Sequence, residues 1–329
     1  MRTIRHCLSG PILLLTFALL FVSGCGESSR RNSSEARRPI PVRVGYPPIV
    51  ASLPFAIAQD QGLFSTNDVT VEATVFVNSN DMLNSLVAKQ IDLLPAVSLI
   101  PIIQLEIQYP GIVRLFSHSR MRPEKAFDSI IVKDNASIHA LSDLQGKKIG
   151  VFPGTSASNL LKAFLKKHGV SSDNVTLVQL APPAQLSALQ SGAVDALFTY
   201  EPVTTTALKA GAYRSIFGSV YADLLNPCPV GTSVISRNFE RKYPEAAKSV
   251  IQALDQATLV QRNQPAKARP LIEKLTKTPA DIAAAVNVVD ITLSDENDAP
   301  TLQRFIDLLF EIGEIPERIK AERLLAPTN

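Results

Sequence analysis

The sequence contains no tryptophan and only three cysteines in 329 residues. Cys7 lies in a segment that we expect to be removed during export, which leaves Cys25 and Cys228. So few cysteines exclude a disulfide-stabilised scaffold. Histidine is also scarce, and the three histidines beyond that segment show no spacing typical of metal ligands, so we expect no metal site. They are His118, His139 and His168.

The chain also lacks a large excess of either positive or negative charge. Lysine and arginine total 33 against 30 aspartates and glutamates, and removal of Arg2 and Arg5 with the leader leaves 31 against 30. A near-neutral chain carries no electrostatic footprint for nucleic acid. There is no Gly-x-Ser-x-Gly elbow, no phosphate loop and no dinucleotide fingerprint, so no catalytic motif of these classes is indicated.

The first 24 residues are typical of a signal peptide. Arg2 and Arg5 precede an apolar run at residues 8–22, which is shorter than the roughly 20 residues of a membrane-spanning helix. The run ends in Val22-Ser23-Gly24-Cys25, which resembles the bacterial lipobox, in which the cysteine is diacylated and becomes the new N-terminus. An ordinary secretory leader and an uncleaved N-terminal helix remain alternatives, and both place the rest of the chain outside the cytoplasm.

Lipidation at Cys25 would anchor the protein to a membrane. Two acyl chains hold a protein on a bilayer because each buried methylene contributes about 0.8 kcal/mol. Residues 25–39 are polar with almost no apolar side chain, as expected of a flexible tether. Gly26 stands where an aspartate would signal retention at the inner membrane, so transfer to an outer membrane is favoured in a cell that has one.

From Pro41 onward, short β-rich runs alternate with amphipathic helical segments, which predicts an α/β fold. The composition, 46% hydrophobic, supports one large or two ordinary domains. We expect a two-lobed arrangement, with residues 40–119 and 232–329 in the first lobe and residues 120–231 in the second. Two crossings between the lobes would form a hinge. Ligands of open α/β sheets bind beyond the carboxyl ends of the strands, so the residues that follow each strand are the candidates.

Four passages resemble the type II periplasmic solute-binding proteins of the aliphatic sulfonate, nitrate, taurine and thiamine-precursor group. They are GYPPIVASLPFAIAQDQGLF at 45–64, QIDL at 90–93, DLQGKKIGVFPGTSASNLLKAFLKKHGV at 143–170, and SGAVDA at 191–196 followed by YEP at 200–202. The resemblance implies two α/β lobes that close on a small solute, neither catalysis nor a cofactor, and delivery to the permease and ATPase of an ABC importer. It also implies a monomer.

Gly154, Thr155 and Ser156 are the most specific site candidates, because they lie between a predicted strand at 147–152 and a predicted helix at 159–168. Such a turn offers backbone N–H groups at the positive end of a helix dipole, together with hydroxyls. It suits a sulfonate, carboxylate, nitrate or phosphate, or the polar edge of a heterocycle. The alternative is a plain N-cap that satisfies the donors of the helix itself.

The first lobe repeats this pattern after its predicted strands at 42–46, 69–77 and 93–97. An aromatic ring after the first strand would stack on a planar group, and polar side chains after the others would contact the solute. Helix capping and simple surface exposure are the alternatives. The candidates are Tyr46, Ser52, Leu53, Asn78, Ser79, Asn80 and Ser98.

Tyr200 and Glu201 complete the candidate set. Several relatives carry a tryptophan where Tyr200 stands, which leaves the ligand open. If Glu201 points into the cleft, it favours a ligand with an amine, amidine or N–H group, since an unpaired buried carboxylate is costly. Otherwise Glu201 points to solvent or pairs with a lysine. We interpret Cys228, which has a proline on either side, as a small packed residue.

Two further functions remain open. A pyrimidine synthase of the same fold uses a histidine and bound pyridoxal phosphate, but that class carries a cysteine-rich iron motif, and the export signal also argues against it. A ligand-sensing partner of a signalling receptor would keep the fold without transport.

Overall fold

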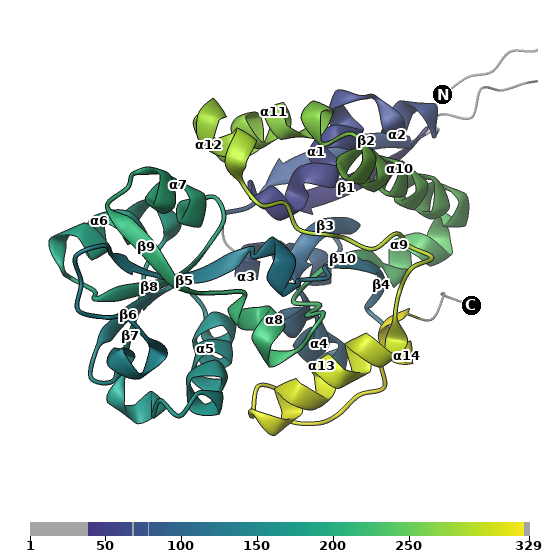
Figure 1. The fold of residues 1–329 in the computed structure, drawn as a ribbon. Helices are drawn as coiled ribbons and strands as arrows, with labels where there is room; N and C mark the ends of the chain where they lie inside the picture. Colours follow the sequence, from purple (N-terminus) through teal and green to yellow (C-terminus); the bar gives the residue numbers. More distant parts are fainter. Residues whose placement is uncertain (1–38, 68, 78, 326–329) are drawn as a thin grey trace, which may run out of the picture. The chain divides into compact units, whose positions relative to one another are not determined.

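The computed structural model describes residues 39–67, 69–77 and 79–325 (Figure 1). The chain divides into a unit of residues 1–38 and a unit of residues 39–329, and all described residues belong to the second unit. The predicted signal peptide and Cys25 lie outside the described residues. Within the described part of the chain, no helix combines the length and the apolar character that crossing a bilayer requires.

The first of two sheets has five strands in the order β2-β1-β3-β10-β4. Strand β1 pairs in parallel with β2 in a register that runs to Tyr46 opposite Val75, and it also pairs in parallel with β3. Strand β10 is antiparallel to both β3 and β4. The strands are β1 (Ile40–Tyr46), β2 (Val69–Val75), β3 (Leu93–Ser98), β4 (Val113–His118) and β10 (Gly231–Ser236).

Helices from both ends of the described unit cover this sheet. Helix α1 packs on α10 and α11, and Val44, Phe55 and Ile57 are fully buried in the same core cluster as Leu254. The apolar run in residues 53–58 therefore forms an interior helix. The helices near this sheet are α1 (Leu53–Asp60), α2 (Leu63–Thr66), α3 (Ser79–Val87), α4 (Leu99–Gln108), α9 (Arg237–Lys242), α10 (Pro244–Asn263) and α11 (Pro265–Thr276).

The second sheet also has five strands, in the order β7-β6-β8-β5-β9. Strands β6, β7 and β8 run parallel, and β5 lies antiparallel between β8 and β9. Helices α5 to α8 belong to this half of the chain (Figure 1). The elements are β5 (Asp128–Lys133), β6 (Lys148–Val151), α5 (Thr155–Lys167), β7 (Thr176–Gln179), α6 (Pro182–Ser191), β8 (Ala196–Tyr200), α7 (Val203–Lys209), β9 (Tyr213–Gly218) and α8 (Val220–Leu224).

The two sheets and their flanking helices confirm the α/β class predicted from the sequence. Strands β1 to β4 and β10 form one sheet and β5 to β9 the other, while the residue bounds of the lobes stay a prediction. Helix α5 begins at Thr155, one turn earlier than residue 159, so Thr155 and Ser156 belong to its first turn.

Three stretches of backbone meet where the sheets are joined. The first crossing, residues 119–127, pairs with the second crossing, residues 219–230, through Met121 and Cys228. It also pairs with residues 286–298, which we call the strap, through a bridge between Ser119 and Ile291. The strap lies between α12 (Ala280–Ala285) and α13 (Ala299–Glu311), and α14 (Glu322–Leu325) follows. The sequence predicted two crossings but not the strap beside them.

Candidate functional site

The predicted residues of the first sheet gather at one edge. Because β1, β2 and β3 are parallel, Tyr46 and Ser98 end their strands on the same side, where Ser79 also begins α3. The Tyr46 ring is half-buried and packs on Phe55, with 4.8 Å between ring centroids. This edge therefore combines one aromatic ring with several polar side chains.

Ser52 and Leu53 are both fully buried. The Ser52 hydroxyl donates to the carbonyl oxygen of Pro47 at 2.7 Å, and Leu53 packs in the core that contains Phe55. In this conformation the two side chains shape the loop after β1 and present no group to a solute. The sequence could not reveal this, because the pattern of that loop does not show which side chains turn inward.

The polar turn after β2 is exposed, as expected for a surface corner. Ser79 and Asn80 are exposed at the start of α3, and Asn78 lies outside the described residues. Ser98 is the N-cap residue of α4, yet its side chain makes no capping hydrogen bond. Its half-buried hydroxyl has no hydrogen-bond partner within the described residues.

The turn at Gly154 links β6 to α5 at the matching edge of the second sheet. Gly154 has φ +122°, ψ 158°, a conformation that only glycine adopts without strain. Its N–H donates to Gln179 Oε1 at 3.3 Å, which ties the turn to the end of β7. No side chain caps α5, so the Thr155 and Ser156 hydroxyls are not used as a cap, and the first-turn N–H groups of the helix have no side-chain acceptor within the described residues.

Tyr200 ends β8 at this same edge and stands in a cluster of rings. Its ring is stacked on Phe127 at 6.2 Å and tilted against Phe152 at 5.8 Å between centroids. Its hydroxyl lies 2.5 Å from that of Tyr221, and burial raises the pKa of Tyr200 above its ordinary value. The Tyr200 hydroxyl is thus already hydrogen-bonded within the protein, so only the ring of Tyr200 is left as a candidate contact for a solute.

Glu201 is buried, with 6% of its surface exposed. Its carboxylate accepts from the N–H and hydroxyl of Thr205, at 3.1 and 2.9 Å, and from the Asn287 N–H at 3.4 Å. Burial raises its pKa above the usual glutamate range. Glu201 therefore neither pairs with a lysine nor points to solvent. It joins the start of α7 to the strap.

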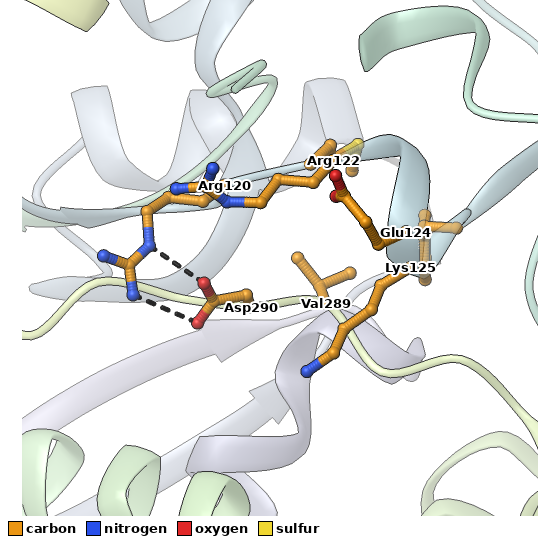
Figure 2. Close-up of a pocket in the computed structure, with 8 residues that line it drawn as sticks. Arg120, Arg122, Glu124, Lys125, Val289 and Asp290 are labelled. Carbon is orange, nitrogen blue, oxygen red and sulfur yellow. Dashed lines mark hydrogen bonds and ion pairs between the residues drawn. The ribbon is translucent and has the colours of Figure 1, made fainter. Parts of the chain in front are cut away.

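A small cavity of about 110 Å³ lies between the first crossing and the strap (Figure 2). Arg120 closes one side, where its guanidinium contacts the Asp290 carboxylate at 2.9 and 3.2 Å. Met121, Phe127 and Val289 give the cavity an apolar part. The remaining lining residues are Arg122, Glu124 and Lys125.

Phe127 connects this cavity with the predicted site. It packs against the core cluster that also contacts Tyr46, and its ring stacks on Tyr200. Phe127, Phe152 and the cations that line the cavity were not predicted from the sequence; the cations are Arg120, Arg122 and Lys125. The available signal was the basic sequence Arg120-Met121-Arg122 in the first crossing, but nothing local links it to Asp290 in the strap, which is 170 residues away.

Two groups at the junction are deeply buried. Asp128 begins β5, and one of its carboxylate oxygens accepts from the Tyr221 N–H at 3.2 Å, while the other has no hydrogen-bond partner in the described structure. Burial raises the pKa of Asp128 to about 7. Cys228 is 1% exposed, and burial raises the pKa of its thiol, in agreement with the prediction of a packed residue. Within the described residues, no group of three or more His, Cys, Asp or Glu side chains is placed to hold a metal ion.

A sequence profile for the family described as "NMT1/THI5 like" matches residues 50–268 of this chain. A Brucella abortus (strain 2308) protein, named provisionally as a binding protein, is 26% identical over 244 residues, which cover 72% of each chain.

Solved structures share the fold. The periplasmic aliphatic sulphonate binding protein SsuA from Escherichia coli superposes with a TM-score of 0.72 at 23% identity, covering 87% of this chain and 97% of that one. The desulfurization enzyme DSZB superposes with a TM-score of 0.65 at 17% identity, covering 87% and 96%. The same fold therefore serves both binding proteins and an enzyme.

Proposed function

The chain belongs to the NMT1/THI5-like family, and from this membership we propose that it is an exported solute-binding protein of an ABC importer. It captures a small polar organic molecule or oxyanion between its two lobes and delivers it to the permease and ATPase subunits. The family match and the binding proteins among its relatives support this function.

The observation that carries the proposal is the placement of polar strand-to-helix corners at one edge of each sheet. Gly154, Thr155 and Ser156 stand at the edge of the second sheet, and Tyr46, Ser79 and Ser98 at that of the first. We propose that these two edges contact one solute when the lobes close. A ligand that touches both lobes stabilises the closed form, because it binds that form more tightly than the open one.

The ligand class follows from the groups at these corners. The uncapped first turn of α5 and the hydroxyls beside it favour an oxyanion or the polar edge of a heterocycle. The rings of Tyr200 and Phe152 favour a ligand that also has an apolar or planar part. A sulfonate, taurine or a pyrimidine-type solute combines the two, and nitrate uses the polar part alone. The hypothesis that Glu201 favours a ligand with an amine or amidine group loses its basis, because the Glu201 carboxylate already accepts hydrogen bonds from Thr205.

We propose further that Cys25 carries the lipid anchor and that residues 25–39 tether the binding unit to the membrane, where it acts as a monomer. The wild-type protein should incorporate a labelled fatty acid, and Cys25→Ser should abolish the label, because the diacylated thioether can no longer form. Labelling of this variant at the wild-type level would contradict lipidation at Cys25.

A thermal-stability screen tests solute binding directly. The purified protein is melted with sulfonates, taurine, nitrate, amino acids and pyrimidines, and a bound solute raises Tm by mass action. Ser156→Ala should weaken a hit, whereas Ser187→Ala on α6 should not, because the Ser187 hydroxyl donates only to the nearby carbonyl of Ala184. No hit in the panel, or an equal effect of the two variants, would count against the site.

DSZB makes an enzyme of this fold the second candidate. Incubation of each hit with the protein, followed by mass spectrometry of the solute, separates the two functions. A binding protein returns the solute unchanged, whereas turnover into a product would reject the proposal of binding without catalysis.

A further inference from the structure

The cavity between the first crossing and the strap has a charge pattern that the solute-binding function does not require. None of the residues proposed to contact the solute at the corners lines it. Its lining contains three cationic side chains and two carboxylates. Whether the cavity can attract an anion depends on which of these charges are already paired.

Arg120 and Asp290 neutralise each other. They make two hydrogen bonds of 2.9 and 3.2 Å, and Arg262 also approaches the Asp290 carboxylate at 3.4 Å. The negative charge of Asp290 is therefore compensated by Arg120 and Arg262, and Asp290 does not neutralise the other cations of the cavity. Arg120 also approaches Glu296 at 3.6 Å, which fixes its orientation.

Arg122 and Lys125 are the unpaired cations. Across residues 39–67, 69–77 and 79–325, their side chains make no hydrogen bond and no ion pair. The remaining carboxylate of the lining, Glu124, points in a different direction from the Lys125 ammonium group (Figure 2). Both cations line one cavity, and neither makes an ion pair with the Glu124 carboxylate.

The walls of the cavity strengthen this field. Met121 and Val289 are 8% and 4% exposed, and Phe127 is half-buried against the ring of Tyr200. Arg122 and Lys125 are themselves exposed, so the apolar walls lower the local dielectric constant only on the inner side of the cavity. A guanidinium group suits an oxyanion, because it is planar and donates two parallel hydrogen bonds.

We propose that this hinge cavity is a second binding site, which takes a small oxyanion such as sulfate or the terminal sulfonate or carboxylate of a short acid. The cavity of about 110 Å³ has room for a sulfate-sized group. Because one wall belongs to the first crossing and the other to the strap, a bound anion links these two segments of the hinge.

The test uses inorganic sulfate as the probe and chloride at equal ionic strength as the reference. Sulfate should raise the Tm of the purified protein in a saturable manner, and calorimetry then gives its affinity. The double variant Arg122→Gln/Lys125→Gln should bind sulfate at least tenfold more weakly. The matched control, Lys162→Gln/Lys166→Gln on the exposed face of α5, removes the same charge and should keep the wild-type affinity.

Unchanged affinity in the hinge variant, or an equal loss in the α5 control, would overturn the proposal, since the effect would then be absent or only one of net charge. Ser156→Ala separates this site from the solute site. It should leave sulfate affinity unchanged, and a tenfold loss would show that sulfate binds at the α5 corner instead. If the hinge variant does not fold, Lys125→Gln alone should still weaken sulfate binding severalfold, and wild-type affinity in that variant would reject the site.

Discussion

At the scale of single residues, the side chains that sit in unusual surroundings are Asp128, Glu201 and Ser52. Each is almost fully buried, and the three differ in how their polar atoms are hydrogen-bonded. Ser52 donates to a backbone carbonyl and Glu201 accepts from Thr205 and Asn287, whereas one oxygen of Asp128 has no partner in the described structure. A buried carboxylate with an unpaired oxygen is costly when it is ionised.

Asp128 should make stability fall with increasing pH. Burial raises its folded-state pKa to about 7, above the unfolded value of 3.8, so between these values the folded state holds more protons than the unfolded state. The free energy of unfolding is therefore highest below about pH 4 for this group and decreases until about pH 7, by up to about 4 kcal/mol. The neighbouring Tyr200, Tyr221 and Cys228, whose pKa values burial raises, stay neutral in this window.

Asp128→Asn keeps an acceptor for the Tyr221 N–H and removes the titration. The difference in unfolding free energy between variant and wild type, measured by urea denaturation from pH 4 to pH 8.5, should move in favour of the variant as the pH rises. A difference that is independent of pH would show that Asp128 does not titrate in this range.

At the scale of elements, the corner between β6 and α5 depends on the backbone of Gly154. Gly154→Ala adds a Cβ that meets no other atom within 4 Å, so the substitution acts through the strained φ of +122°. It should lower the free energy of unfolding by about 1–3 kcal/mol and weaken solute binding, because the turn must change direction to relieve the strain. Chemical denaturation and titration with a hit from the screen measure the two effects.

Gly169 at the other end of α5 provides the matched control. It also has a positive φ, +76°, and its added Cβ would meet no atom either. Gly169→Ala should destabilise the protein by about 1 kcal/mol without changing solute affinity, since this end of the helix is away from the corner. Equal losses of affinity in both variants would indicate that Gly154 acts through general stability alone.

At the scale of the whole molecule, the strap fastens the C-terminal part of the chain to the hinge. Arg120 and Arg262 pair with Asp290 and Glu296, and the Arg262 interaction lowers the pKa of Glu296 to about 2. A network of partly buried bidentate pairs contributes more than isolated surface pairs do. The Asn287 amide also donates to the Ala126 carbonyl at 2.9 Å.

Arg120→Gln should therefore lower the free energy of unfolding by about 1–2 kcal/mol, because it removes two charge-assisted hydrogen bonds. Hydrogen exchange should become faster at the Arg120 amide, which donates to the Asp290 carbonyl of the strap, and at the Thr292 amide, which donates to the His118 carbonyl at the end of β4. The control, Lys274→Gln, breaks a more exposed pair with Asp60 and should cost less than about 0.5 kcal/mol. Similar losses in the two variants would mean that the network adds nothing to its separate pairs.

The sequence by itself determined what depends on neighbours along the chain. Apolar patterns predicted the strands at 42–46, 69–77, 93–97 and 147–152 and the helix at 159–168, which correspond to β1, β2, β3, β6 and α5. Gly154 was identifiable because a turn between a strand and a helix needs its free backbone. Strands β4 and β9 were missed. Each is an edge strand with polar residues in its pattern, such as Arg114 and Arg214, so the local signal for a strand was weak.

Only the tertiary structure decided which polar side chains form hydrogen bonds and ion pairs within the protein. Glu201 finds Asn287 86 residues further along, and Arg120 finds Asp290 170 residues away, so no local pattern could assign these partners or the cavity they border. The side chains of Ser52 and Leu53 are also buried, which the local sequence pattern did not show. The physical reason is that propensity and periodicity act over a few residues, whereas hydrogen-bond satisfaction and packing are settled between segments that meet only after the chain has folded.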